Sequence, residues 1–313
     1  MVSSEGLPEV WEGKVPWLPG DPWRMKLDNS QARAFWHCPL GWKERYGNNL
    51  EPRDRSSDAL AFGTRMHQLL ENRHRGLQGR EAQEFPVLPD MALEAEAQLT
   101  FAAYEAYYPE EPFEVVGVER YFEVSVQCLE CQDNPGQLTP CRGKHAVSPS
   151  TWHIYCGEFD AIVRMKDSGR LWLLETKTEK RGGKDNHPEG WQQKSQVGLY
   201  LWAAQEVYGE EFEGILLNII TRQSPKGQER PSFRRDNLVR TSGQMREAVR
   251  NLVWVADQIE HCTREGFFPT NRNNCVSPWG WKCDYFPLHS TEERSEELVR
   301  IKFKEAEPYL SGL

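Results

Sequence analysis

The chain has 313 residues, of which 38% are hydrophobic and 11% aromatic, and this composition excludes a wholly disordered protein. No run approaches the roughly 18 apolar residues of a membrane span, and the first residues lack the basic flank and apolar stretch of a secretory signal, so we expect a soluble, cytoplasmic protein with no membrane partner. The net charge of −9 disfavours, at first sight, a polyphosphate partner.

Helical patterns dominate the first third of the sequence. Apolar residues recur at helical spacing over 29–46, with an interruption at Cys38-Pro39, and again over 57–75 and 91–108. Residues 1–20 are rich in Pro, Gly and Trp and are predicted to form an irregular arm.

The negative charge is concentrated in one helical segment. Residues 81–114 contain nine Asp and Glu but no Lys or Arg, which accounts for the whole net charge of −9. The remainder of the chain is neutral, so a nucleic-acid partner is not excluded. We expect this segment to face away from any such partner.

Beyond residue 113 the sequence alternates between strand and helix patterns. Short β-branched and apolar runs predict strands, and two longer periodic stretches predict helices. This order favours an α/β fold with a central mixed sheet flanked by helices. The predicted strands are 115–127, 152–165, 170–178, 214–221 and 232–240, and the predicted helices are 191–207 and 244–264.

These patterns also suggest a division of the chain. The compositional changes separate helical, α/β and Cys-rich parts. The predicted parts are an irregular arm (1–20), a helical region (21–112), an α/β core (113–266) with a Cys-rich insertion (128–150), a Cys-rich segment (267–290), and a C-terminal helix and tail (291–313).

Two carboxylates and a lysine are predicted to meet where two strands pair. Residues i and i+2 of a strand share a face, so Glu175 and Lys177 point to the same side. If the second and third predicted strands form a hairpin, Asp160 joins them. Converging carboxylates suit Mg²⁺ or Mn²⁺, and a lysine beside them can orient a water and stabilise charge on a phosphate. A surface salt-bridge cluster is the alternative reading, and Glu158, on the face of Asp160, is an alternative carboxylate.

The order of these motifs resembles the PD-(D/E)XK nuclease superfamily. Asp160, then Glu175-Thr176-Lys177, then Gln196-x-x-x-Tyr200 is similar to its RecB-like exonuclease branch, which includes CRISPR-associated and phage enzymes with a cysteine cluster. Gly63-Thr64-Arg65-Met66-His67 resembles the first helical motif of that branch. Glu119 stands where the family often carries an acid, although an exposed strand glutamate explains it equally well.

The resemblance implies a restriction-endonuclease-like core and a metal-dependent DNA exonuclease. The implied ligands of Mg²⁺ or Mn²⁺ are His67, Asp160, Glu175 and the Thr176 carbonyl. The implied catalytic residues are Asp160, Glu175 and Lys177, and Gln196 and Tyr200 would brace the site and contact nucleic acid.

One cysteine lies in the N-terminal helical region, and two cysteines and a histidine lie far away near the C-terminal end of the predicted core. In part of the RecB-like branch, one N-terminal and three C-terminal cysteines hold a 4Fe-4S cluster, and this sequence resembles that layout with Cys38, Cys275, Cys283 and His289. It departs from the layout in two ways: the last position is His289 rather than a cysteine, and the spacing between Cys275 and Cys283 is long. Imidazole can ligate iron, three Cys and one His equally suit zinc, and a metal-free cluster is a third possibility.

A second cysteine group lies in the insertion at 128–150. A C-x-x-C pair followed by C-x-x-x-H fits a tetrahedral zinc site, and the insertion has too few apolar residues to order itself without a metal. His153 or Cys156 are alternative fourth ligands, and a loop with free thiols is the alternative to a metal site. The predicted structural zinc ligands are Cys128, Cys131, Cys141 and His145.

Local charge indicates where DNA would bind. Residues 222–250 carry eight basic against three acidic residues, and residues 177–184 carry four against one. Such stretches can neutralise a phosphate backbone, although ordinary solvated surface is the alternative. The candidate contacts are Lys180, Arg181, Arg234 and Arg235.

The leading hypothesis is a Mg²⁺- or Mn²⁺-dependent exonuclease acting on single-stranded DNA or duplex ends. A non-catalytic DNA-end-binding or assembly subunit of a recombination or spacer-acquisition (CRISPR-adaptation) complex is the alternative. A sequence-specific endonuclease is less favoured, because the sequence shows no separate base-reading domain.

Overall fold

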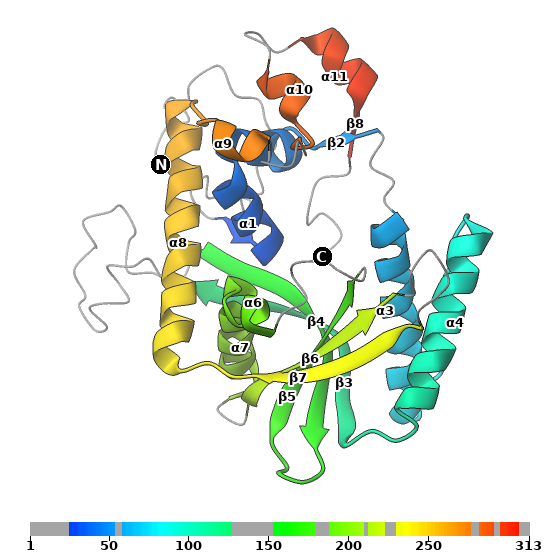
Figure 1. Cartoon of the computed structure of the whole chain (residues 1–313). Coiled ribbons are helices and arrows are strands. Elements are labelled where there is room, and N and C mark those ends of the chain that lie inside the picture. Colours follow the sequence, from blue (N-terminus) through cyan, green and yellow to red (C-terminus); the bar gives the residue numbers. More distant parts are fainter. Residues whose placement is uncertain are drawn as a thin grey trace. The chain divides into compact units, whose positions relative to one another are not determined.

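The computed structural model shows two compact units, each built from separate stretches of the chain (Figure 1). The terminal unit comprises Met1–Arg55, Glu123–Cys156 and Val249–Leu313, and the sheet unit comprises Ser56–Phe122 and Gly157–Ala248. No helix among the described residues is long and apolar enough to cross a membrane. The structure describes residues 25–53, 58–126, 153–179, 188–209, 212–222, 230–276, 282–290 and 295–306.

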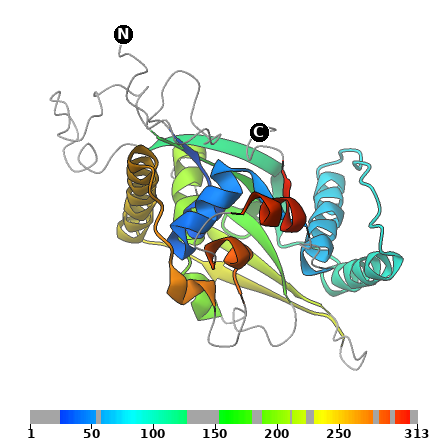
Figure 2. The same cartoon turned by 90° about the horizontal axis from the view of Figure 1, so that it is seen from above.

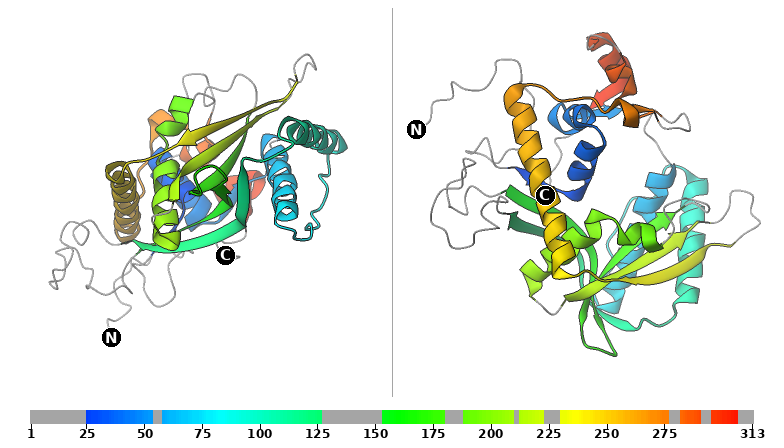
Figure 3. Two further views of the ribbon diagram at one scale, coloured as in Figure 1. Left: turned by 90° about the horizontal axis from the view of Figure 1, so that it is seen from below. Right: turned by 60° about the vertical axis from the view of Figure 1, so that its left-hand side comes forward.

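A mixed sheet forms the centre of the sheet unit. β4 pairs antiparallel with β5, β5 pairs parallel with β6, and β6 pairs antiparallel with β7, while β3 pairs with β4 (Figure 3). The predicted α/β class with a central mixed sheet is therefore confirmed. The strands are β3 (Phe113–Val126), β4 (His153–Met165), β5 (Leu171–Glu179), β6 (Phe212–Thr221) and β7 (Ser232–Leu238), and the last residues of β3 and the first of β4 extend into the terminal unit.

Helices cover both faces of this sheet. Gly63 of α3 approaches Thr178 of β5 so closely that an added Cβ would lie 3.0 Å from its Oγ1. On the alternate face of β5, Gln196 of α7 reaches Glu175, because successive strand residues point to opposite sides. The helices of this unit are α3 (Asp58–Leu77), α4 (Met91–Tyr107), α6 (Pro188–Gln192) and α7 (Ser195–Tyr208), with the start of α8 (Ser242–Glu265).

The core beneath α3 and α4 follows from their apolar spacing. The two helices lie side by side (Figure 2), and Phe62, Met66, Ala97 and Ile220 are fully buried between them and the sheet. Asp90 caps α4 by accepting from the first backbone N–H groups of the helix. Position 67, one residue after the buried Met66, is thereby held at the border of the core.

In the terminal unit, the predicted helical interruption at Cys38-Pro39 is confirmed. Asp28 caps α1 (Asn29–His37), which stops at Cys38, and Pro39 opens α2 (Pro39–Trp42) as its first residue, a position where its missing N–H costs nothing. The other elements are β1 (Lys26–Leu27), the π-helical turn η1 (Lys43–Gly47), β2 (Leu50–Pro52), α9 (Arg272–Cys275), α10 (Phe286–His289), α11 (Glu296–Lys302) and β8 (Phe303–Glu305).

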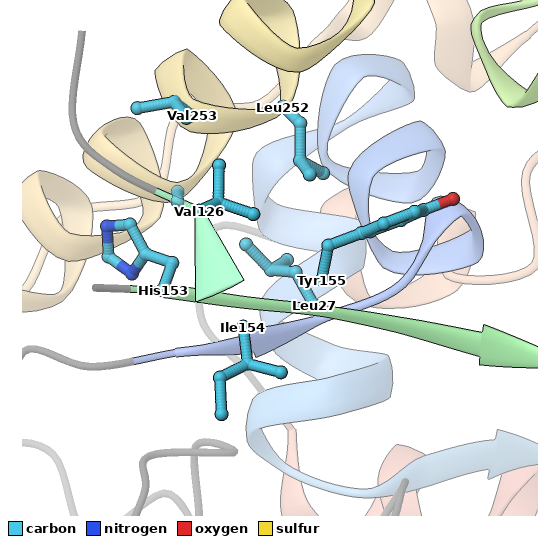
Figure 4. A pocket seen from close by; sticks show the side chains of 8 residues that line it. Leu27, Val126, His153, Ile154, Tyr155, Leu252 and Val253 are labelled. Carbon is cyan, nitrogen blue, oxygen red and sulfur yellow. The ribbon is translucent and has the colours of Figure 1, made fainter. Parts of the chain in front are cut away.

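A small apolar hollow lies in the terminal unit, between β1, the ends of β3 and β4, and α8 (Figure 4). Leu27, Val126, Leu252 and Val253 are among the residues that line it, and it leaves no room for a water molecule. An apolar hollow too small for water is ordinary packing, so the candidate functional residues must be sought elsewhere.

Candidate active site

The hairpin of β4 and β5 brings the predicted carboxylates and lysine together. Ala161 pairs with Leu174 in the antiparallel ladder, which sets Asp160 beside Glu175. The backbone N–H of Thr176 donates to Asp160 Oδ2 at 2.7 Å, and Lys177 Nζ lies 2.5 Å from Glu175 Oε1. The hairpin assumed from the sequence is therefore the one observed.

His67 reaches this hairpin from α3. Its Nδ1 lies 3.5 Å from Asp160 Oδ1. Together with Glu119 of β3, these residues form a group whose nitrogen and carboxylate oxygens all lie within 4.8 Å of one another. Glu175 is adjacent but pairs with Lys177, and Glu158, the alternative carboxylate, stays exposed. The grouped donors are thus one imidazole and two carboxylates.

Glu119 enters the site through an irregularity of β3. Its backbone has φ = 44°, in the left-handed region that non-glycine residues rarely adopt. The buried positions of β3 change from odd to even numbers around it, from Phe113 to Phe122 and Val124, as expected at a β-bulge. Glu119 is not among the metal ligands predicted from the sequence. The apolar alternation of the strand shifts between Val115 and Phe122, and this shift is a signal that could have revealed the irregularity at Glu119.

The electrostatics of the group indicate a site that favours positive charge. Burial, reinforced by the charges of Asp160 and Glu158, raises the pKa of Glu119 to about 8. Burial acts to lower the pKa of His67, but the charge and hydrogen bond of Asp160 prevail and raise it to about 9. Burial also opposes ionisation of Asp160, yet His67 and then Lys177 hold the pKa of its carboxyl below the usual value. A cation bound among these groups would offset the repulsion between the carboxylates of Glu119, Asp160 and Glu158. The residues therefore fit a divalent ion.

The residues predicted to brace the site hold different positions. Gln196 Nε2 donates to Glu175 Oε1 at 3.0 Å, so it orients a carboxylate directly. Tyr200 packs edge-on against Phe122 and Phe159, with ring centroids 5.9 and 5.6 Å away. Thr176 is buried, and its hydroxyl accepts from Asn218 Nδ2 at 3.2 Å.

The two described arginines of the predicted DNA contacts differ in exposure. Arg234 is partly exposed and bonds Asp236 at 2.8 Å. Arg235 is bound through both terminal nitrogens to Glu111, at 2.5 and 3.0 Å, and to the Tyr104 hydroxyl at 2.7 Å. This buried pairing favours a structural role for Arg235.

The remaining predicted site residues divide between described and undescribed parts of the chain. Cys38, Cys275, Cys283 and His289 gather in the terminal unit. Lys180 and Arg181, and the predicted zinc ligands Cys128, Cys131, Cys141 and His145, lie outside the described residues.

Comparison with known proteins places this arrangement in a family. Two solved structures are similar over most of the chain: a "Putative exonuclease" from Eubacterium rectale (13% identity, 92% of this chain and 94% of that chain, TM-score 0.47) and the protein SSO0001 (11% identity, 82% of this chain and 87% of that chain, TM-score 0.33). No curated protein matches the sequence. Residues 29–287 match the PD-(D/E)XK nuclease superfamily, and the chain therefore belongs to that superfamily.

Proposed function

We propose that the protein is a metal-dependent DNA exonuclease of the RecB-like branch. The observation that carries this proposal is the convergence of His67, Glu119 and Asp160 beside the Glu175–Lys177 pair. The order of motifs along the chain, with a histidine on the first core helix and Gln196 after the lysine, supports the RecB-like assignment.

The proposed ligands of the ion are His67, Glu119 and Asp160, with Glu175 and the Thr176 carbonyl beside them. Two carboxylates suit Mg²⁺ and Mn²⁺, and the imidazole favours the softer Mn²⁺. When bound, a divalent ion polarises the scissile phosphate and lowers the pKa of water.

The chain's own residues then act on the phosphodiester. Lys177 carries a positive charge at the end of a buried strand, with its side chain 28% exposed, where it can orient the attacking water and stabilise the charge that develops on the phosphate. Glu175 fixes the ammonium group at 2.5 Å, and Gln196 in turn fixes Glu175. The N–H of Thr176 holds Asp160 in place for the ion.

Substitution of the two central residues tests the proposal. Asp160→Asn and Lys177→Met should each slow Mn²⁺-dependent cleavage of end-labelled linear DNA by about 100-fold or more. Asp167→Asn is the matched control, because Asp167 lies in the exposed turn of the same hairpin, where its carboxylate accepts a hydrogen bond from the adjacent Ser168 N–H. Lys177→Met protein that cleaves single- and double-stranded DNA as fast as the wild type would refute the mechanism.

A second DNA substrate distinguishes exonuclease from endonuclease cleavage. An exonuclease should degrade linear single-stranded DNA and leave covalently closed circles intact, whereas cutting of the circles would make it an endonuclease. Wild-type protein that binds DNA ends without cutting them, with Mn²⁺ present, would favour the alternative function, an end-binding or assembly subunit in recombination or spacer acquisition.

A further inference from the structure

Three thiols and one imidazole converge in the terminal unit, separate from the carboxylate site. Cys38 lies between α1 and α2, Cys275 ends α9, and His289 ends α10. The ligand atoms of these three lie within 4.8 Å of one another. Cys283, between α9 and α10, adds a fourth donor beside His289.

The spacing of these donors matches ligands that share one small ion. Zn–S bonds of about 2.3 Å and Zn–N bonds of about 2.0 Å at tetrahedral angles place a sulfur and a nitrogen ligand about 3.5 Å apart. His289 Nδ1 lies 3.5 Å from Cys275 Sγ and 3.8 Å from Cys283 Sγ. Both distances agree with tetrahedral coordination of a single ion.

The same spacing does not fit a 4Fe-4S cluster. Each ligand of such a cluster binds a different iron at a different corner, so that the ligand atoms surround four irons and four sulfides rather than one ion. Donors separated by 3.5 and 3.8 Å leave no room for that body between them. The resemblance to cluster-containing nucleases therefore does not extend to the contents of this site.

The surroundings of Cys38 are those of a thiolate ligand. The backbone N–H of Gly41 points at Cys38 Sγ at 3.4 Å, which stabilises negative charge on the sulfur. Metal ligation requires the deprotonated form of the thiol.

We propose that Cys38, Cys275, Cys283 and His289 bind one structural zinc ion in a Cys₃His set, in place of an iron–sulfur cluster. The set has four protein donors and no position left for substrate, as in structural rather than catalytic zinc sites. The ion ties the α1–α2 corner to the segment that carries α9 and α10. That segment is anchored a second time by the Tyr285 hydroxyl, which donates to the Leu50 carbonyl at 2.7 Å.

Metal analysis of the full chain, purified without oxygen, tests this proposal. Wild-type protein should contain zinc and no iron, and Cys38→Ser should contain one zinc per chain less than the wild type. Cys262→Ser is the matched control, because Cys262 is a buried thiol of the same unit outside the cluster, and it should keep the full zinc content. Asp160→Asn, which alters the carboxylate site, should keep it as well.

A second measurement covers the case in which Cys38→Ser does not fold. Cobalt-substituted wild type should show the intense visible bands of a tetrahedral thiolate site, and His289→Cys, which retains four donors, should bind cobalt with a changed spectrum. Iron with acid-labile sulfide and visible absorption in the wild type would overturn the proposal. Equal zinc content in wild type and Cys38→Ser, or a cobalt spectrum that His289→Cys leaves unchanged, would overturn it too.

Discussion

The protonation of His67 and Glu119 predicts a steep pH dependence of metal binding at the carboxylate site. An imidazole must be neutral and a carboxyl ionised before either can bind a cation. With a pKa of about 9, His67 is neutral in only about one molecule in 100 at pH 7. Protonation of His67 alone should therefore keep the apparent affinity of the proposed site for Mn²⁺ about 100-fold below its value at high pH. With a pKa of about 8, Glu119 adds roughly another tenfold.

Both groups act in the same direction, so affinity should rise with pH. Isothermal titration calorimetry between pH 6.5 and 8.5 should show Mn²⁺ binding strengthening by more than tenfold per pH unit at the lower end, with one to two protons released per ion. Glu119→Gln should reduce the proton release, while Asp167→Asn should leave it unchanged. An affinity that is constant over this range, with no proton release, would refute the proposed electrostatic competition between protons and the ion.

Three further substitutions test the structure around the site. Gly157→Ala should destabilise the protein by about 1–3 kcal/mol in thermal unfolding, because the new Cβ would lie 2.8 Å from Phe122 Cζ; an unchanged melting temperature would show that the ring can move. Arg235→Met should lower stability to urea by about 3 kcal/mol, because it removes a partner of the buried Glu111; unchanged stability with weakened DNA binding would instead support a DNA contact. Gln196→Ala should reduce kcat about tenfold at unchanged melting temperature, because it frees the carboxylate that Gln196 orients; full activity would exclude that role.

The Asp160–Glu175–Lys177 group was accessible from the sequence because its geometry is local. Strand alternation places Glu175 and Lys177 on one face, and the short turn between β4 and β5 leaves little choice of pairing. The helical break at Cys38-Pro39 was equally readable, because proline restricts both its own backbone and that of the preceding residue.

Other features depend on contacts that local patterns do not encode. The left-handed backbone of Glu119 is held by the surrounding sheet rather than by the residue's own preference. The pairing of Arg235 with Glu111 joins residues 124 positions apart, so a basic residue that reads as solvent-exposed has a side chain that is only 9% exposed. The sequence predicts only a helix and a tail at the C-terminus and does not predict the pairing of β2 with β8. Strands of three residues are too short to show a recognisable pattern.

The separation of the cysteine ligands along the chain has a consequence for biosynthesis. Cys38 and His289 are about 250 residues apart, and at roughly 5–20 residues per second the ribosome needs about 13–50 s to synthesise that stretch. For nearly all of this interval Cys38 has neither its partner cysteines nor its histidine, because Cys275 is synthesised only 14 residues before His289. Every residue of the carboxylate site, from His67 to Gln196, is made before the four donors can meet. Capture of the proposed zinc ion would therefore be one of the last events in maturation, and a nascent chain deprived of metal would carry an oxidisable thiol beside the already synthesised sequence of the carboxylate site.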